Sequence, residues 1–293
     1  MSKKALVVEG GAMRGIFAAG VLDSFLQEEY NPFQFTIGAS AGASNLLGYL
    51  AKQPKRSYQI ITDLGTSKNF YNPARFVKGG HLTDVKWLSE TSLQQYPLQL
   101  DELLSNIPLY AATTDINTGV ANYFKVTKDN LLNVMEATTA LPIAYRETPC
   151  FSGSCFTDGA VADSIPVKEA YRRGARDITV ILSHPLSYTM PKSNSHWLMK
   201  RLLSDNPVVA DTLKTRANRY NQALDFIRFP PNDAKVRVIA PPQDFPVKRL
   251  SRQRDVLESG YQMGINAGAE HLANLRGNKR YALEECPACY ALQ

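Results

Sequence analysis

The sequence contains no long apolar run. None of its hydrophobic stretches approaches the roughly 18 residues that a membrane-spanning helix needs. The apolar run that follows the two N-terminal lysines ends after four residues, which is too short for the core of a secretory signal peptide. We therefore expect no transmembrane helix and no secretion. The predicted location is the cytoplasm, with membrane contact at most peripheral.

Cysteine is scarce as well. Four cysteines in 293 residues do not make the dense disulfide framework of a small secreted domain. Cys286 and Cys289 have the spacing of a redox or zinc pair, but they lack the strand-to-helix setting of a redox pair. Cys150 and Cys155 would complete a zinc site only across a long gap. We expect four reduced thiols, no metal and no other cofactor.

Repeats and low-complexity tracts are also absent, and 44% hydrophobic against 20% charged residues is typical of a globular chain rather than a disordered one. Short apolar runs alternate with helical patterns along the sequence. Strands are predicted over residues 5–8, 33–37, 109–114, 120–126, 177–182 and 236–240. The alternation predicts an α/β fold, with a central, mostly parallel sheet between layers of helices.

The pattern changes near residue 190. Beyond it the chain is mainly helical, with helices predicted over 195–204, 207–228 and 252–275. The proline-rich joints in this part are turns and are too short to separate independent domains. We therefore divide the chain into a principal domain over 1–190 and a basic, mainly helical C-terminal region over 191–293, packed on it.

Positive charge is concentrated in that C-terminal region. The chain has a formal net charge of +6, and Pro191–Arg280 holds 16 Lys and Arg against 8 Asp and Glu, whereas the remainder holds 17 against 19. Such asymmetry indicates an anionic partner surface, although a solvated helical face carries interleaved charges of the same kind. Because no nucleic-acid-binding motif accompanies the charge, we expect contact with anionic lipid and no nucleic acid.

A nucleophile elbow is the most specific motif. Gly38-Ala39-Ser40-Ala41-Gly42 fits the pattern Gly-x-Ser-x-Gly, with a predicted strand before it and a predicted helix after it. The serine of such an elbow sits on a sharp, strained turn, and small neighbours let the chain pass close by. The N-terminus of the next helix directs a partial positive charge toward the serine oxygen. Ser40 is therefore the candidate nucleophile, and Gly38 and Gly42 shape its turn.

A glycine-rich turn follows the first predicted strand. It reads Gly10-Gly11-Ala12-Met13-Arg14-Gly15 and opens the first predicted helix, where backbone N–H groups can bind an anion. A dinucleotide fingerprint fails, because Ala12 replaces its second glycine and no acidic residue closes the second strand. An oxyanion hole fits, because acyl transfer needs donors fixed where negative charge develops. The candidate donors are the N–H groups of Gly10, Gly11, Ala12 and Met13.

A third motif, Asp158-Gly159-Ala160, follows residues 151–157, which read as a strand or hairpin. Alone, an Asp-Gly pair usually marks only a turn. Its value comes from the other two motifs, because a serine nucleophile needs a base and a carboxylate in a partly dry site can serve.

Together these motifs resemble those of the patatin-like phospholipases. That family carries a Gly-Gly-Gly-x-Arg/Lys-Gly loop, then Gly-x-Ser-x-Gly, then Asp-Gly-Gly/Ala, in the order found here. Residues 112–119 and 137–142 also resemble the family's middle strand pair and the helix before its catalytic Asp strand. The resemblance covers residues 5–185. One departure is Ala12 at the third glycine of the loop, where the extra methyl narrows the site or forces a different backbone angle.

The resemblance implies a three-layer α/β/α fold and a serine acyl hydrolase of the phospholipase A, lysophospholipase or esterase type that cleaves lipid acyl esters. Asp158 would take the proton of the Ser40 hydroxyl, Ser40 would attack the ester carbonyl, and the glycine-rich turn would hold the oxyanion without a metal. Arg14 and Gly15 are the substrate-binding residues of this scheme. Arg14 would either meet a phosphate head group or brace the loop.

Two other functions stay open. An α/β-hydrolase would use a Ser-His-Asp triad, and His184, which ends a predicted strand, is its best-placed histidine; His196 and His271 qualify by order alone. That fold needs more strands before the elbow than this sequence offers. A non-catalytic protein would bind anionic lipid through the glycine-rich turn and the basic region, but it would not need both Ser40 and Asp158.

Overall fold

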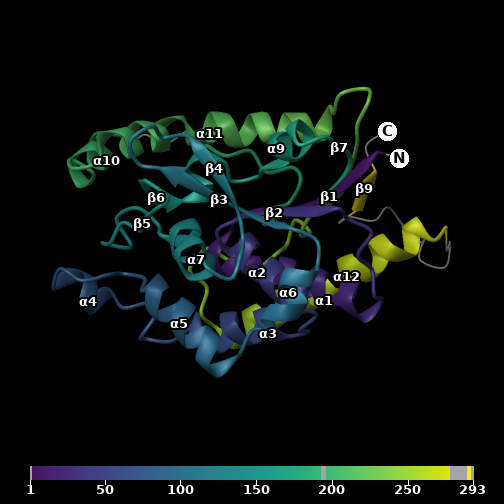
Figure 1. Ribbon diagram of the computed structural model, residues 1–293, viewed down its shortest axis with the longest axis horizontal. Coiled ribbons are helices and arrows are strands. Elements are labelled where there is room, and N and C mark those ends of the chain that lie inside the picture. The colour runs from purple at the N-terminus through teal and green to yellow at the C-terminus, as the bar shows by residue number, and fades with distance from the viewer. Residues whose placement is uncertain (1, 193–195, 278–288, 292–293) are drawn as a thin grey trace.

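A mixed sheet forms the centre of the molecule (Figure 1). The computed structural model describes residues 2–192, 196–277 and 289–291. The nine strands of this part of the chain are arranged in the order β5-β6-β3-β2-β1-β7-β8-β9, and β4 also pairs with β3. The parallel strands are β1 (Lys3–Val8), β2 (Phe35–Ala39), β3 (Leu109–Asp115), β7 (Ala175–Ile181) and β8 (Lys235–Ile239). The antiparallel strands are β4 (Ala121–Lys125), β5 (Cys150–Phe151), β6 (Ser154–Asp158) and β9 (Cys289–Ala291).

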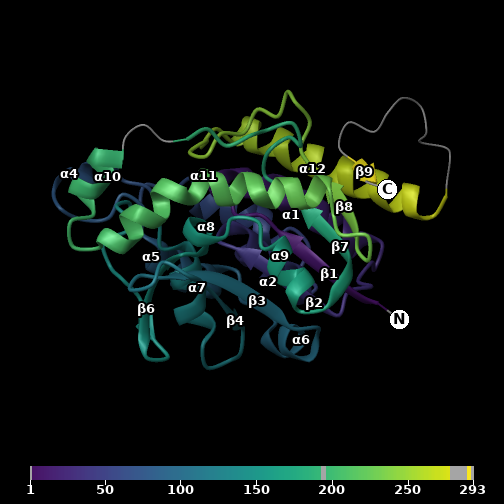
Figure 2. The same ribbon diagram turned by 90° about the horizontal axis from the view of Figure 1, so that it is seen from above.

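Helices cover both faces of the sheet, so the expected three-layer α/β/α architecture is confirmed. The central strands are apolar on both faces, as parallel strands between two helical layers must be; in β1, for example, Ala5–Val8 are fully buried. Figure 1 shows one layer along the length of α11 and the other around α1 and α12, and Figure 2 looks down on α11 from above. The first layer contains α8 (Gly159–Ala162), α9 (Val167–Arg172) and α11 (Pro207–Arg228). The second contains α1 (Gly15–Gln27), α2 (Ala41–Leu50), α7 (Leu131–Thr139) and α12 (Arg254–Leu275).

Glycines let α12 lie unusually close to α1. A Cβ at Gly20 of α1 would lie 2.2 Å from the carbonyl oxygen of Tyr261, and a Cβ at Gly264 of α12 would lie 2.1 Å from that of Phe17. The interior glycines of α12, which weaken a helix in isolation, therefore permit backbone contact that no larger residue allows. Residues beyond 190 thus contact the earlier part of the chain through α11 on one face of the sheet and α12 on the other, while β8 extends the sheet.

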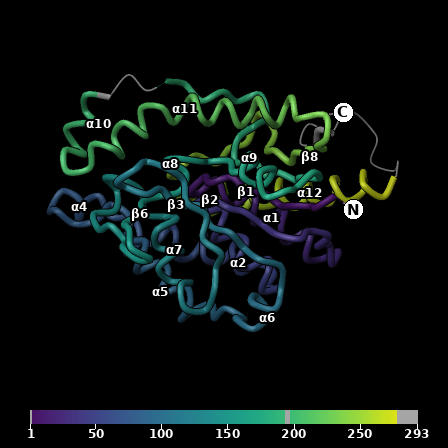
Figure 3. The backbone as a smooth tube through the Cα atoms, turned by 45° about the horizontal axis from the view of Figure 1, so that its top comes forward, coloured from purple at the N-terminus to yellow at the C-terminus, as the bar shows by residue number. Residues whose placement is uncertain are grey.

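The remaining helices lie outside the two main layers. The segment between α2 and β3 contains α3 (Arg56–Gln59), the π-helix η2 (Ile60–Leu64), α4 (Pro73–Val77), α5 (Val85–Gln95) and α6 (Leu100–Ser105). The short helix α10 (His196–Leu202) folds back beside the start of α11, at the end of the molecule that also carries α4 (Figure 3). Within the described ranges, every helix is too short or too polar to cross a membrane.

The six predicted strands and three predicted C-terminal helices all form, with ends shifted by a few residues. The expectation of four reduced thiols is wrong for Cys150 and Cys155, which form a disulfide. These two residues face each other across the hairpin of β5 and β6, because the Ser152-Gly153 turn folds their short segment back on itself. Cys289 lies in β9, and Cys286 lies outside the described residues.

Candidate active site

Two strands that are distant in sequence end at the same point of β3. β2 runs parallel to β3 and its last pair is Ala39 with Ala112. β6 runs antiparallel to β3 and its last pair is Asp158 with Thr113. Because β4 occupies the opposite edge of β3, β2 and β6 share one edge and meet end to end. Ser40 follows directly after Ala39, so this topology brings Ser40 and Asp158 together.

Ser40 occupies a strained elbow between β2 and α2. Its φ of 52° and ψ of −127° lie outside the regions that side-chain-bearing residues ordinarily adopt. The chain can turn here only because its neighbours are glycines: a Cβ at Gly38 would lie 2.5 Å from the nitrogen of Ala43, and a Cβ at Gly42 would lie 2.4 Å from the carbonyl oxygen of Val8. The turn exposes just 7% of Ser40, and its hydroxyl donates a 2.8 Å hydrogen bond to Oδ2 of Asp158.

Asp158 is completely buried. Its Oδ1 accepts the N–H of Ala160 at 2.7 Å, and its main-chain carbonyl accepts the hydroxyl of Thr114 at 2.8 Å. Burial raises the pKa of Asp158, and the hydrogen bonds from Ala160 and Ser40, with the charges of Arg216 and Arg249, act in the opposite direction. Gly159 is required beside it, because a Cβ there would lie 2.0 Å from the carbonyl oxygen of Ala112.

Thr138 fixes the backbone of the elbow. Its hydroxyl accepts the N–H of Ser40 at 2.9 Å and donates to the carbonyl of Ala112 at 2.6 Å. The side chain is fully buried and comes from the last turn of α7. Residues 137–142 had marked this helix only as a family likeness, so no role for Thr138 was predicted. The only feature of the sequence that points to a role for Thr138 is the pair of threonines at the end of an apolar helix.

Of the four candidate donors in the glycine-rich turn, two N–H groups are bonded to acceptors in the described part of the chain and two are not. The N–H of Gly10 donates to the carbonyl of Ser164 at 3.2 Å, and the N–H of Met13 donates to the carbonyl of Arg249 at 3.4 Å. Among the described residues, no acceptor is bonded to the N–H of Gly11 or of Ala12. Of the four candidate donors, these two are therefore available to a bound anion.

Ala12 takes the left-handed conformation, with a φ of 49°. A glycine reaches this region without steric cost, whereas an alanine is strained there. This explains why the family pattern has a glycine at the position. The N–H group of Ala12 is retained in this conformation, and the effect of its extra methyl on the width of the site stays a prediction.

Arg14 and Gly15 have different surroundings. Arg14 is half-buried and lines a cavity beside Ser40, and its Nε has no hydrogen-bond partner within the described part of the chain. The carbonyl of Gly15 accepts a 2.7 Å hydrogen bond from Asn45, and a Cβ at Gly15 would lie 3.1 Å from that of Ala41. Gly15 therefore lets α1 pack on α2, and its expected contact with substrate stays a prediction.

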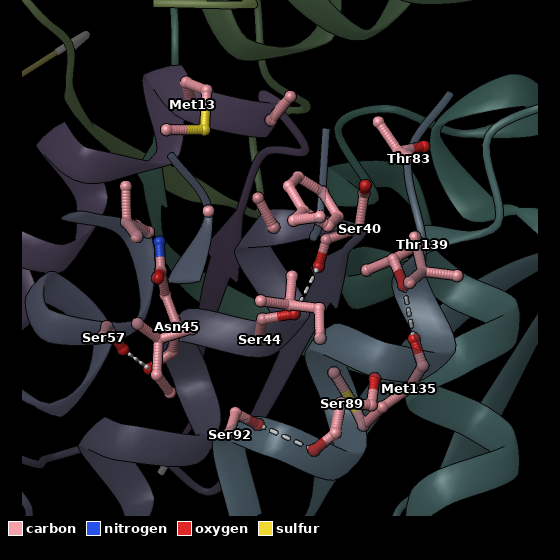
Figure 4. A pocket seen from close by; sticks show the side chains of 18 of the residues that line it. Met13, Ser40, Ser44, Asn45, Ser57, Thr83, Ser89, Ser92, Met135 and Thr139 are labelled. Carbon is pink, nitrogen blue, oxygen red and sulfur yellow. Dashed lines mark hydrogen bonds between the residues drawn. The ribbon is translucent and has the colours of Figure 1, made fainter. Parts of the chain in front are cut away.

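Ser40 lies between two cavities of different character. The first, called the apolar cavity, has a volume of about 160 Å³ and extends from Ser40 toward α5 and α7. Figure 4 shows Ser40 beside it, with Met13 from η1 (Ala12–Arg14) and Met135 from α7. Its apolar lining is mainly aliphatic and includes Leu47, Ile60, Leu88, Leu93, Leu131 and Met135.

The second, called the basic cavity, has a volume of about 450 Å³ and reaches the surface beside α10 and α11. Ser40 and Asp158 lie at its inner end, with Gly10, Gly11 and Ala12. Four cations line it: Arg14, Lys214, Arg216 and Arg249. The sequence singled out Arg14 and gave Arg249 only as part of the basic region. It placed neither Lys214 nor Arg216 near Ser40, because both are ordinary polar-face residues in the pattern of α11.

Of the three histidines of the rival triad, His184 and His271 are not hydrogen-bonded to Ser40. His184 lines the basic cavity and stacks on Tyr188, with ring centroids 3.8 Å apart. Burial, with the charges of Arg14 and Arg216, lowers its pKa to about 3. His271 is buried in α12, where burial lowers its pKa to about 4. The side chain of His196 lies outside the described part of the chain.

Metal-ligating side chains do not gather in the described ranges, where no group of three or more His, Cys, Asp or Glu is placed to hold an ion. The polar groups that the structure brings together at this point are the hydroxyl of Ser40, the carboxylate of Asp158 and the N–H groups of the glycine-rich turn.

Comparison with known proteins shows the family and the fold of the chain. The chain is 36% identical over 280 residues to the uncharacterized protein YjjU of Escherichia coli (strain K12), which covers 92% of this chain and 77% of YjjU. A crystal structure of VipD from Legionella pneumophila has a similar fold, with a TM-score of 0.53 at 12% identity over 93% of this chain and 67% of VipD. A family model described as a domain of unknown function, DUF6363, matches residues 206–277. The model of the Patatin-like phospholipase family matches residues 6–171, more than half of the chain, and includes the elbow, the glycine-rich turn and Asp158. The chain therefore belongs to the patatin-like phospholipase family, whose members are lipid hydrolases.

Proposed function

We propose that this protein is a serine acyl hydrolase that cleaves lipid acyl esters with Ser40 as nucleophile and Asp158 as general base. The observation that carries the proposal is the 2.8 Å hydrogen bond from the Ser40 hydroxyl to Asp158, made at a strained elbow between two cavities. A nucleophile and a base within hydrogen-bond reach are the minimum for covalent acyl transfer. No histidine is needed, since Asp158 is itself in contact with the hydroxyl.

The reaction follows from these contacts. Asp158 takes the proton of the Ser40 hydroxyl as the oxygen attacks the ester carbonyl, and burial favours the neutral carboxylic acid that results. The N–H groups of Gly11 and Ala12 donate to the oxyanion as negative charge develops there. Asp158 then gives its proton to the departing alcohol. A water molecule attacks the acyl-enzyme, and Asp158 accepts a proton from it. As the bond from the Ser40 oxygen to the acyl carbon breaks, Asp158 returns that proton to the Ser40 oxygen, and the fatty acid leaves.

The two cavities divide the substrate between them. The aliphatic lining of the apolar cavity suits the acyl chain, because burying hydrocarbon there removes it from water. The alcohol side of the ester then faces the basic cavity and the solvent. This arrangement favours lipid acyl esters, the substrates of phospholipases A, lysophospholipases and lipid esterases, over short polar esters.

Labelling with a fluorophosphonate probe, followed by peptide mapping, tests the proposal. The probe should modify Ser40 and not Ser44, which lies one helical turn away. Labelling and hydrolysis of p-nitrophenyl esters should both be lost in Ser40→Ala. Ser204→Ala removes an exposed hydroxyl outside both cavities and should retain both activities. A folded protein that binds lipid but neither reacts with the probe nor hydrolyses any ester would instead be a non-catalytic binder.

We also propose that the protein works in the cytoplasm and contacts anionic membranes at their periphery. The support comes from α10, where Trp197 is 70% exposed and Leu202 is also exposed, next to the cations Lys200 and Arg201. Met199 of the same helix lines the basic cavity. A helix that joins apolar and cationic side chains at the mouth of the site suits a lipid–water interface.

A further inference from the structure

The basic cavity is lined by more cationic side chains than there are carboxylates close to it. Arg14 and Arg216 line it half-buried, and Lys214 and Arg249 line it from exposed positions. Within the described residues, none of the four makes an ion pair. Two carboxylates act on them electrostatically: Asp158 at the inner end of the cavity, and Glu9 buried behind the glycine-rich turn.

Among the residues that the structure describes, neither carboxylate makes a direct ion pair with a cation of the cluster. Asp158 is occupied by the Ser40 hydroxyl and the N–H of Ala160. Glu9 accepts the N–H of Ser183 at 2.6 Å and the hydroxyl of Tyr220 at 2.9 Å. Burial raises the pKa of both acids. The four cations therefore outnumber the two nearby carboxylates, and both carboxylates are hydrogen-bonded to groups outside the cluster.

The cations are also close enough to disfavour one another. The pKa of Arg14 is lowered first by burial and also by the charge of Arg249, and the pKa of Arg216 is lowered by the same two causes. Arg14 leaves its Nε without a partner. Partly burying Arg14 and Arg216 without a direct ion pair costs free energy that an anionic occupant would return. Arg216 is held in place by bonds of 2.7 Å to the carbonyl of Ala160 and 3.2 Å to Ser164.

We propose that the basic cavity binds a phosphate group carried on the alcohol side of the scissile ester, and that the C-terminal region selects such substrates through Lys214, Arg216 and Arg249. This inference rests on the proposed function, because Ser40 fixes the ester between the two cavities. Guanidinium and ammonium groups bind phosphate oxygens through strong charge-assisted hydrogen bonds. Three of the four cations lie within residues 206–277, so the segment of unknown function completes the site of the hydrolase domain and sets its specificity.

A matched pair of single-chain lipids tests this selectivity. Oleoylglycerol and oleoylglycerol phosphate share the acyl chain and the ester and differ only in the phosphate. The wild-type kcat/KM should favour the phosphate-bearing lipid by about ten-fold or more, the value of one good charge-assisted bond. The double variant Lys214→Gln/Arg249→Gln should bring that ratio close to unity. The matched control Lys235→Gln removes an exposed cation of the same region that does not line the cavity, and it should keep the wild-type ratio. Equal rates on both lipids in the wild type, or an unchanged ratio in the double variant, would overturn the proposal.

Binding to Ser40→Ala, measured by calorimetry, separates this inference from the proposed reaction. The phosphate site would be supported, and the hydrolase refuted, by two results together. The phosphate-bearing lipid would bind Ser40→Ala tightly and more weakly once Lys214→Gln/Arg249→Gln is added, and the wild-type protein would hydrolyse no ester. Hydrolysis of both lipids without preference would support the hydrolase and refute the phosphate site.

A titration with inorganic phosphate distinguishes a lipid phosphate site from a free-phosphate site. Inorganic phosphate should bind at least about ten-fold more weakly than the phosphate-bearing lipid, because the lipid also fills the apolar cavity. Equal affinity for inorganic phosphate would show a free-phosphate site and overturn the substrate assignment.

Discussion

Thr138 holds the main chain of Ser40 through a 2.9 Å hydrogen bond from the Ser40 N–H to its hydroxyl. The same hydroxyl donates to the carbonyl of Ala112 at 2.6 Å, so one side chain joins the elbow to β3. Ser40 keeps its unfavourable φ of 52° because surrounding groups bind it there. Thr138 acts on the reaction through Ser40 and is a positioning residue.

Thr138→Val should misplace the nucleophile without unfolding the protein. Valine has the shape of threonine but leaves a buried N–H and a buried carbonyl unpaired, which costs about 1–3 kcal/mol of stability. We expect kcat to fall by about ten-fold or more with little change in KM, because a misplaced nucleophile affects the transition state more than substrate binding. Thr138→Ser keeps the hydroxyl and should restore both kcat and Tm. A fall in Tm with an unchanged kcat would leave Thr138 with a purely structural role.

Ser40 and Asp158 should behave as one unit in a double-mutant cycle. Loss of the general base in Asp158→Asn should reduce kcat by about 10²–10⁴-fold, and Ser40→Ala should abolish the covalent step. The double variant should be no worse than Ser40→Ala, because residues that act together give non-additive losses. Additive effects on log kcat would show that the two residues act independently.

The substitution Asp158→Asn should not destabilise the protein. Burial raises the folded-state pKa of Asp158 above its unfolded value, so folding favours the protonated form, and the stability gained from the proton is lost as pH rises through the folded-state pKa. Asn carries no charge at any pH. Thermal unfolding of Asp158→Asn should therefore give a Tm equal to or above that of the wild type at neutral pH, and the advantage should shrink in acid.

The pH profile of hydrolysis should have its acid limb at Asp158. Its ionised form is the base, so kcat/KM should fall as pH drops through a pKa that lies above the ordinary carboxyl value of about 4. Arg216 and Arg249 limit that rise, so Arg249→Gln should move the limb to higher pH. In His184→Gln the limb should stay, because burial already lowers the pKa of His184 to about 3. Loss of the limb in His184→Gln would point to a histidine base.

Local sequence was enough to find the chemical groups of the site. The elbow around Ser40 and the turn at Gly10–Gly15 are contiguous motifs, because each must bend the chain within a few residues. Asp158 was found by its place in the order of motifs. Its contact with Ser40 depends on β2 and β6 ending on one edge of β3, a fact of topology that no local pattern contains.

The groups that sequence reasoning missed are those set by packing between distant segments. Lys214 and Arg216 look like the polar face of any surface helix, and only the docking of α11 over α8 brings them to the cavity. Cys150 and Cys155 were treated as thiols because their spacing was compared with metal sites. The hairpin register places the two cysteines opposite each other. The only sign of this hairpin in the sequence is the Ser152-Gly153 turn between two short runs.

Ala12 offers a direct test of strain in the oxyanion turn. Its φ of 49° suits glycine, so Ala12→Gly should relieve a folded-state cost of about 1 kcal/mol and should lose a similar amount through the greater freedom of the unfolded chain. We expect a Tm close to that of the wild type, with hydrolysis retained. Ala12→Val, which places a branched side chain at a positive φ, should lower both Tm and kcat. Tolerance of valine would show that this backbone conformation is not required for the reaction.

Binding to anionic vesicles should depend on α10. Trp197 is 70% exposed on this helix, and Phe229, after the end of α11, is 80% exposed. The 22 residues of α11 span about 33 Å, and α10 contacts α11 while Phe229 follows its last residue. Phe229 is therefore a matched control for an exposed aromatic side chain that does not line the basic cavity. Co-sedimentation with phosphatidylglycerol vesicles at low salt should be weakened by Trp197→Ser and unchanged by Phe229→Ser. Arg201→Gln should weaken it further and reduce its sensitivity to salt, because one basic residue near an anionic surface contributes about 1 kcal/mol that salt screens. Equal binding to neutral and anionic vesicles at low salt, or equal losses in the two aromatic variants, would mean that α10 is not the contact.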